Sequence, residues 1–179
     1  MNRMKTTKLV TCALFAALTA ILSQIAIPIG PVPINLATFS VFFAGALLGA
    51  KAGALSQLVY LLLGIVGLPV FSMFRGGPGV LLGPTGGYLA GYVLAAFLVG
   101  FITEQRGDSL PALALAMPAG FLAYMTAGTL WYMISTGSSL VAACMVCVVP
   151  FIPGDILKMV LAAVLARSLK PILQKRWAY

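Results

Sequence analysis

Residues 148–166 read "VVPFIPGDILKMVLAAVLA". Asp155 and Lys158, both in this segment, are the only charged residues among the 58 that separate Asp108 from Arg167. A run this apolar is typical of a membrane helix, where a charge is costly to insert and usually serves a function. Because helical residues three positions apart share a face, the segment predicts a last membrane helix with an acid and an amine side by side near its start.

The composition of the whole chain is that of a membrane protein. Of its 179 residues, 61% are hydrophobic and 8% are charged, whereas about a quarter of the residues in a soluble domain are charged. Charge-free runs cover residues 9–50, 52–74, 76–103 and 109–154. Since about 20 apolar residues span a bilayer, the two longest runs have room for two helices each. We therefore predict an all-α membrane protein whose solvent is the lipid bilayer.

We predict one integral membrane domain over residues 1–179. Its six transmembrane helices are expected at residues 9–27, 33–50, 52–68, 86–103, 111–134 and 154–170. The breaks between them carry turn residues, as in "PIGPVP" (28–33). The apolar N-terminal stretch resembles a signal peptide, but it continues to Ile27 and more apolar segments follow, so we interpret it as an uncleaved first helix.

The distribution of basic residues predicts the orientation. Six spans leave both termini on one side of the membrane, and nine of the eleven basic residues fall on that side. These are Arg3, Lys5, Lys8, Lys51, Arg106, Arg167, Lys170, Lys175 and Arg176. By the positive-inside rule that side is cytoplasmic, so we expect a multi-pass protein of the cell membrane with both termini in the cytoplasm. Arg75 and Lys158 are the two exceptions and need another explanation.

Two segments do not fit regular spans. Residues 68–88 hold six glycines and three prolines between the third and fourth helices. Irregular backbone at membrane depth survives only where protein buries it or where it lines a cavity, so this outward loop is expected to wall a pocket and to approach a ligand closely. Residues 140–150 are apolar but too short to span. They predict a short helix or re-entrant piece before the sixth helix, which would begin with Asp155 at or near its N-cap.

The sequence excludes most catalytic chemistry. It has no histidine, which rules out Ser-His and Cys-His nucleophiles, and no G-x-x-x-x-G-K-[ST] phosphate loop. Its three acids are too scattered to surround a metal ion, and Cys144 and Cys147 form a lone C-x-x-C pair. The net charge of +8 lies mostly at helix ends and forms no basic stripe for nucleic acid. We expect neither an enzyme nor a cofactor or metal.

Three charged residues are candidates for binding a ligand. Asp155, Lys158 and Arg75 carry a total charge of +1, which a monoanionic guest would neutralise. A small molecule with both an acid and an amide-like group fits, because its carboxylate could pair with a cation while Asp155 accepts from its N–H groups. The alternatives are a purely structural Asp155–Lys158 salt bridge and an exposed loop charge for Arg75. An interfacial aromatic belt is the alternative to ligand stacking for Tyr88, Tyr92, Tyr124, Trp131 and Tyr132.

Small residues recur at four-residue spacing in the first helix. Ala13 and Ala17 form one such pair, and Ala16 and Ala20 form another. Small residues on one face let membrane helices approach closely. The stripe therefore predicts a helix contact, either with a partner protein or with helices of this chain.

Four motifs in this order resemble the BioY family, the biotin-specific substrate-binding (S) components of energy-coupling factor (ECF) transporters. They are "IGPVPINLATFSVFFAGALLG" (29–49), "LLLGIVGLPVF" (61–71), "GVLLGPTGGYLAGY" (79–92) and "PFIPGDILK" (150–158). The resemblance covers essentially the whole chain. It implies a six-helix membrane protein that binds biotin, its transported ligand, in an outward-facing pocket. It also implies a transmembrane coupling subunit and two ATPase subunits as partners.

The resemblance assigns roles to single residues. Asp155 and Lys158 match the Asp and Lys of the family's biotin-binding motif, which implies that Asp155 accepts the ureido N–H groups. Lys158 would bind either the ureido oxygen or the carboxylate. The loop 75–88, with Gly86 and Gly87, would close over the ligand, and Tyr88 would form a wall.

Two further implications concern the carboxylate and the partner. Some family members have an arginine where this chain has Leu89, and a polar amide where it has Arg75, so Arg75 is the candidate carboxylate partner here. The alanines of the first helix match those that dock S components on the coupling subunit. Two alternative functions stay open: an S component for another small carboxylated vitamin, or a membrane assembly subunit that transports nothing.

Overall fold

The computed structural model describes the backbone of residues 3–177 and the side chains of residues 6–172. Its elements are α1 (Arg3–Gln24), β1 (Ala26–Ile27), β2 (Ile34–Asn35), α2 (Ala37–Leu48), α3 (Ala50–Ile65), the short 3-10 helix η1 (Ser72–Phe74), α4 (Pro78–Leu82), α5 (Gly86–Arg106), α6 (Leu110–Thr136), α7 (Leu140–Cys147) and α8 (Ile152–Trp177). The side chains of Arg3, Lys5, Lys175 and Arg176, counted above for topology, lie outside the described ones.

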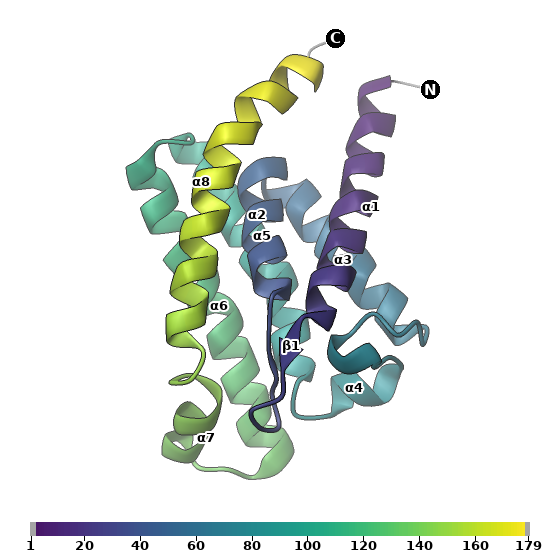
Figure 1. Cartoon of the computed structure of the whole chain (residues 1–179), viewed down its shortest axis with the longest axis vertical. Coiled ribbons are helices and arrows are strands. Elements are labelled where there is room, and N and C mark those ends of the chain that lie inside the picture. The colour runs from purple at the N-terminus through teal and green to yellow at the C-terminus, as the bar shows by residue number, and fades with distance from the viewer. Residues whose placement is uncertain (1–2, 178–179) are drawn as a thin grey trace.

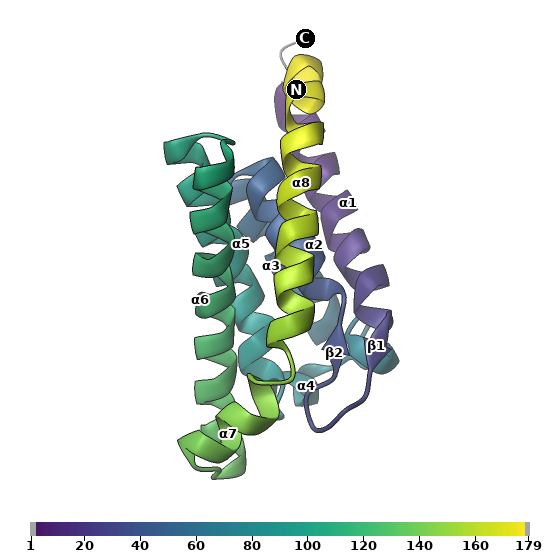
Figure 2. The ribbon, with the colours of Figure 1, turned by 60° about the vertical axis from the view of Figure 1, so that its left-hand side comes forward.

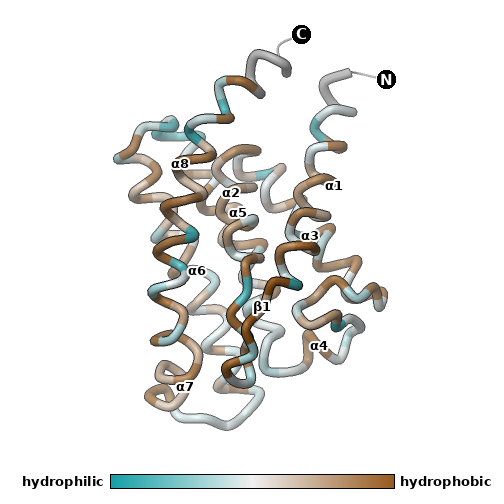
Figure 3. The backbone as a smooth tube through the Cα atoms, in the orientation of Figure 1, coloured by the Kyte–Doolittle hydropathy of each residue, from teal (hydrophilic) through white to brown (hydrophobic). Residues whose placement is uncertain are grey.

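The long helices run side by side along the long axis of the molecule (Figure 1). Both ends of the chain lie at one end of this bundle, as the six predicted spans require. The β1–β2 hairpin, α4 and α7 lie at the opposite end, which is also visible in the rotated view (Figure 2). Brown apolar segments run along the helices and continue into the β1–β2 hairpin and α7 (Figure 3).

Each predicted span overlaps one observed helix, namely α1, α2, α3, α5, α6 or α8. Among the described residues, three helices are long and apolar enough to cross a membrane, and the bent pair of α7 and α8 makes a fourth candidate. The break within that pair bends the chain by 55°. With 12 and 16 residues, α2 and α3 are shorter. At a rise of about 1.5 Å per residue they reach roughly 18 and 24 Å, against a hydrocarbon core of about 30 Å.

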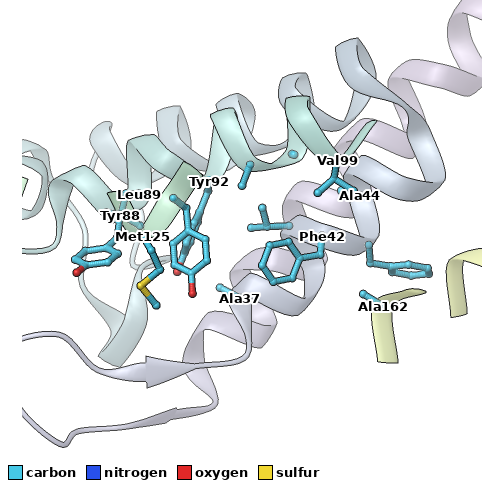
Figure 4. Close-up of a cluster of buried hydrophobic side chains, with 14 of the residues drawn as sticks. Ala37, Phe42, Ala44, Tyr88, Leu89, Tyr92, Val99, Met125 and Ala162 are labelled. Carbon is cyan, nitrogen blue, oxygen red and sulfur yellow. The ribbon is translucent and has the colours of Figure 1, made fainter. Parts of the chain in front are cut away.

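Helix α2 forms the centre of the fold. Ten of its twelve residues are buried, and glycines let its neighbours approach closely. A Cβ added to Gly45 would meet the carbonyl oxygen of Ala96 in α5, and one added to Gly53 of α3 would meet the backbone of Gly45. Without side chains at these points the backbones pack in direct contact, which is how membrane helices gain van der Waals energy. Figure 4 shows Phe42 of this helix within the buried cluster that it shares with Tyr92 of α5.

The end of the bundle opposite the two termini contains short elements, and the sequence pattern predicted only some of them. The first helix ends at Gln24, and Ala26–Ile27 pairs with Ile34–Asn35 as a small antiparallel hairpin. The predicted helix ends at residue 27 and 33 are therefore wrong, because the prolines between them leave the flanking residues free to pair as strands. The glycine-rich loop contains η1 and α4. The short helix predicted at 140–150 is confirmed as α7, Leu140–Cys147.

Candidate binding pocket

A pocket opens at the end of the bundle that lies opposite the two termini. It contains about 500 Å³ of space not filled by atoms, a figure that includes the open solvent at its mouth. Its lining comes from the hairpin, the glycine-rich loop and four helices: Val32, Pro33, Asn35, Thr38, Phe71, Ser72, Arg75, Val80, Thr85, Tyr88, Leu89, Tyr92, Tyr124, Phe151 and Lys158. The chain thus gathers residues from both ends of the sequence around one cavity.

Lys158 brings a positive charge to this pocket. Its Nζ donates to Oδ1 of Asp155 at 2.8 Å, and the two residues are 5% and 0% exposed. The pair lies in the first two turns of α8, which begins at Ile152. The sequence predicts Asp155 at or near the N-cap: it does not cap the helix, because α8 starts three residues earlier and the backbone N–H of Asp155 bonds the carbonyl oxygen of Phe151, but it does lie in the first turn. The carboxylate still lies near the positive end of the helix dipole, which favours its charge.

Asp155 also ties two other helices to α8. Thr38 of α2 donates its hydroxyl to Oδ1 at 3.0 Å, and Tyr124 of α6 donates its phenol to Oδ2 in a short hydrogen bond. An ionised carboxylate offers about four lone-pair positions, and the three bonds to Thr38, Tyr124 and Lys158 leave one for a guest. Asp155 itself is 0% exposed and is absent from the residues that line the cavity. The simple salt-bridge interpretation therefore accounts for only part of its bonding.

Arg75 lies at the mouth of the same pocket. Its side chain is exposed and its Nε donates to the carbonyl oxygen of Ser72 at 3.3 Å. Neither of the two ion pairs among the described side chains includes it. Ser72 also lines the pocket, and its hydroxyl accepts from Asn35 of β2 at 2.6 Å. The mouth therefore has a cation whose charge is available to an anionic guest.

Aromatic side chains form one wall of the pocket. Tyr88, Tyr92 and Tyr124 line it and are each 5% exposed or less, which fits a pocket wall and not a lipid-facing belt. Tyr88 and Tyr92 meet the ring of Tyr124 edge to face, with centroids 6.3 and 6.0 Å apart. Phe151 closes the side next to α8. Figure 4 shows Tyr88 and Tyr92 projecting from the same helix into the buried cluster.

Gly86 and Gly87 do not line the cavity. A Cβ at Gly86 would meet the backbone of Leu81, and one at Gly87 would meet Trp131 and Ala127 of α6. Their absent side chains therefore let α5 start tightly against α4 and α6, which sets the position of Tyr88. Trp131 of α6 donates its indole N–H to the carbonyl oxygen of Gly83 at 2.9 Å. This bond ties α6 to the segment between α4 and α5.

The alanines of α1 do not share one environment. Ala13 and Ala17 are exposed, Ala20 is half-buried, and Ala16 is 1% exposed in the core. The exposed pair lies on the face that also carries Leu14 and Ile21. Ala16 thus fits the internal-packing interpretation, and Ala13 and Ala17 leave a surface for a neighbour.

Several polar residues of the site are not apparent from the sequence. Thr38, Asn35 and Ser72 are uncharged and common in membrane segments, so nothing in the sequence distinguishes them. Tyr124 was considered only for aromatic contacts, although its phenol bonds Asp155. A useful signal would have been that a buried acid needs several donors, which must come from other helices.

The chemistry of the pocket suits binding. No group of three or more His, Cys, Asp or Glu side chains among the described residues could hold a metal ion. What the pocket offers is a deep polar pair, an aromatic wall and a cation at the mouth. Such a site can hold a small, partly apolar anion that carries amide-like groups at its other end.

The chain is similar to known proteins in both sequence and fold. The BioY family matches residues 1–175. The chain is 39% identical over 165 residues to the biotin transporter BioY of Thermotoga maritima, covering 92% of this chain and 96% of that protein. It is 40% identical over 167 residues to the probable biotin transporter BioY of Pyrococcus horikoshii, covering 93% and 98%. Its fold is similar to a crystal structure of the S-component for biotin from an ECF-type ABC transporter, with a TM-score of 0.87, 32% identity, and coverage of 96% of this chain and 94% of that one.

Proposed function

The chain belongs to the BioY family, and from that membership we propose that it is the biotin-binding S component of an ECF-type transporter. The observation that carries the proposal is the buried Asp155–Lys158 pair beside a pocket with an uncompensated cation at its mouth. A charged pair inside a membrane bundle is costly, and two apolar residues would pack there without that cost. A ligand that bonds the pair gives the chain a reason to keep it.

The two ends of the pocket suit the two ends of biotin. Lys158 is deep and its charge is already balanced by Asp155 at 2.8 Å, so it suits the neutral ureido oxygen. We also propose that a ureido N–H bonds the remaining lone pair of Asp155, which requires the side chain of Lys158 or Tyr124 to move aside, because Asp155 does not line the empty cavity. Arg75 at the mouth has no acid partner among the described side chains, so we assign the carboxylate of biotin to it. The net charge of the three residues and a monoanion is then zero.

The middle of the ligand is apolar and would lie against the aromatic wall. Tyr88, Tyr92 and Phe151 border the space between the deep pair and the mouth. Burying apolar surface contributes about 25 cal/mol per Å². The fused rings of biotin and its aliphatic chain would gain this contribution while the polar ends bond the pair and Arg75.

For the membrane arrangement we propose six crossings formed by α1, α2, α3, α5, α6 and α8. The shortness of α2 does not oppose this, because ten of its twelve residues are buried and protein shields it from lipid. Six crossings agree with the two chain ends lying together (Figure 1). The excess of basic residues at that end supports a cytoplasmic location by the positive-inside rule. The pocket would then open outward, as capture of an external vitamin requires.

The partners implied are those of an ECF module, a transmembrane coupling subunit and two ATPase subunits. The chain carries no nucleotide-binding motif of its own, so energy would come from the ATPases. We assign the contact with the coupling subunit to the α1 face that holds Ala13 and Ala17, with Ala20 at its edge. Ala16 is left out of the contact because the core already covers it.

The decisive experiment measures ligand binding by the purified chain. Protein from biotin-starved cells, in detergent, is expected to melt at a higher temperature with biotin, because a ligand that binds only the native state stabilises it. Calorimetry should give a matching stoichiometric heat. A panel of other carboxylated vitamins serves as the control. A shift with one of them and none with biotin would change the ligand, and no shift with any would refute a binding function.

A further inference from the structure

The loop that carries Arg75 has an unusual backbone. Phe71 and Arg75 exchange two backbone hydrogen bonds, of 2.9 and 3.2 Å, and so close a tight turn over residues 71–75. Inside it Met73 has φ of 63° and Phe74 has φ of 56°. Left-handed backbone is unfavourable for residues other than glycine, and both side chains are more than half exposed. Packing of these two side chains therefore does not explain the conformation, and something else must hold it.

The side chain of Gln24 meets both sides of this turn. It is the last residue of α1, and its Nε2 lies 3.1 Å from the carbonyl oxygen of Val70 and 3.2 Å from that of Phe71. Its Oε1 accepts the backbone N–H of Phe74 at 2.9 Å. Only a side chain with a donor and an acceptor on one planar group makes this set of contacts. Ser23 adds a bond from its hydroxyl to Val70 at 2.6 Å.

The turn held in this way contributes two residues to the pocket. Ser72 and Arg75 both line it, and Ser72 accepts from Asn35, which in turn accepts the first N–H of α2. Phe71, the first residue of the turn, has a second anchor, because its ring packs edge to face on Tyr60 with centroids 5.6 Å apart. Loss of the amide contacts would thus free residues 72–75 without releasing the anchor at Phe71.

We propose that Gln24 is a positioning residue for ligand retention: it holds the turn 71–75 so that Ser72 and Arg75 stay over the pocket. The inference rests on the proposed function for its ligand, biotin, and on the contacts above for its mechanism. Removing the amide leaves the deep Asp155–Lys158 pair unchanged. The main effect expected is therefore faster release, because the cation at the mouth is no longer kept in place.

The test compares Gln24→Leu with Gln105→Leu. Gln105 is an exposed residue near the C-terminal end of α5, away from the pocket. Two quantities are measured: hydrogen exchange of the amides of residues 72–75 without ligand, and the dissociation rate of labelled biotin. For Gln24→Leu we expect exchange to accelerate in this turn alone and dissociation to rise roughly tenfold, as for one or two lost hydrogen bonds. Gln105→Leu should match the wild type in both.

A second substitution separates positioning from general damage. Met73→Gly places the residue that adopts left-handed backbone most readily, so in the Gln24→Leu background it should restore part of the protection and slow dissociation again. Val66→Gly, at the C-cap of α3 where φ is −66°, is the control and should restore neither. If Gln24→Leu fails to fold, the same measurements are made on Gln24→Glu, which keeps the acceptor oxygen but loses the donor N–H.

The outcomes are distinguishable. Unchanged exchange in the turn, or an unchanged dissociation rate in a wild-type background that binds biotin, overturns the inference alone. A wild type that binds no biotin overturns the proposed function and, with it, the retention role of Gln24. Accelerated exchange and release that only Met73→Gly reverses support the inference.

Discussion

The hydroxyl of Thr38 donates to the carboxylate of Asp155 at 3.0 Å, across 117 positions of the chain. This bond joins the buried central helix α2 to the start of α8. Tyr124 approaches the other carboxylate oxygen from α6. One acid therefore fixes the mutual positions of three helices beside the pocket, which makes its surroundings the first place to test.

Replacing Asp155 by Asn should weaken both ligand binding and the fold. The change leaves the buried ammonium of Lys158 without its counter-charge, and breaking a buried pair from one side costs about 3–5 kcal/mol. Loss of a charged hydrogen bond to biotin would cost about 1.5–3 kcal/mol of binding. Calorimetry and thermal melting measure the two effects. Asp108→Asn is the control, because it breaks a pair with the buried Lys170 in which the Asp108 side chain is 33% exposed; equal effects from both would contradict the assigned site.

Thr38→Val tests whether the orientation of Asp155 matters to the ligand. Valine has nearly the shape of threonine but cannot donate, so the carboxylate loses one of three donors and the packing stays the same. We expect a loss of about 1 kcal/mol in biotin affinity, read by calorimetry. Thr11→Val is the matched control, because that hydroxyl is exposed and bonds Thr7 within its own helix. A full-affinity Thr38→Val protein would mean that Tyr124 and Lys158 suffice.

Arg75→Gln, assayed with biotin and with its methyl ester, identifies the carboxylate partner. If Arg75 binds the carboxylate, the variant should bind biotin more weakly, by up to about 1 kcal/mol for so exposed a pair, and bind the ester as the wild type does. Lys158→Met, which removes the deep ammonium, should weaken both ligands alike. The reverse pattern, with only Lys158 sensitive to the esterification, would move the carboxylate to the bottom of the pocket.

Ala17→Leu should separate partner docking from ligand binding. The residue is exposed on α1, so a larger side chain is tolerated by the fold but obstructs a close helix contact. Co-purification with a co-expressed coupling subunit should fall while biotin binding is unchanged. Ala114→Leu, exposed on α6, is the control. Ala16→Leu should instead lower the melting temperature, since overpacking a core position costs about 1–3 kcal/mol.

Several features of the fold follow from local sequence. The apolar runs and the prolines predict six helical segments and the short helix before the last one, because the bilayer and the loss of backbone donors act on consecutive residues. The same local logic fails at residues 26–35, where a hairpin forms in place of helix ends. Its strands pair through contacts between segments, and no local pattern encodes their register.

The sequence by itself identified the charges of the candidate site, because a charge in a charge-free run is visible without coordinates. It determined that Asp155 and Lys158 share a helical face and that Arg75 stands in an irregular loop. Only the tertiary structure decided that Thr38, Tyr124 and Ser72 join them. It also decided that Gly86 and Gly87 allow close helix packing and that Gln24 forms hydrogen bonds with the loop. The reason is physical: neutral polar groups gain their role from a partner brought near by helix packing, and that partner lies elsewhere in the chain.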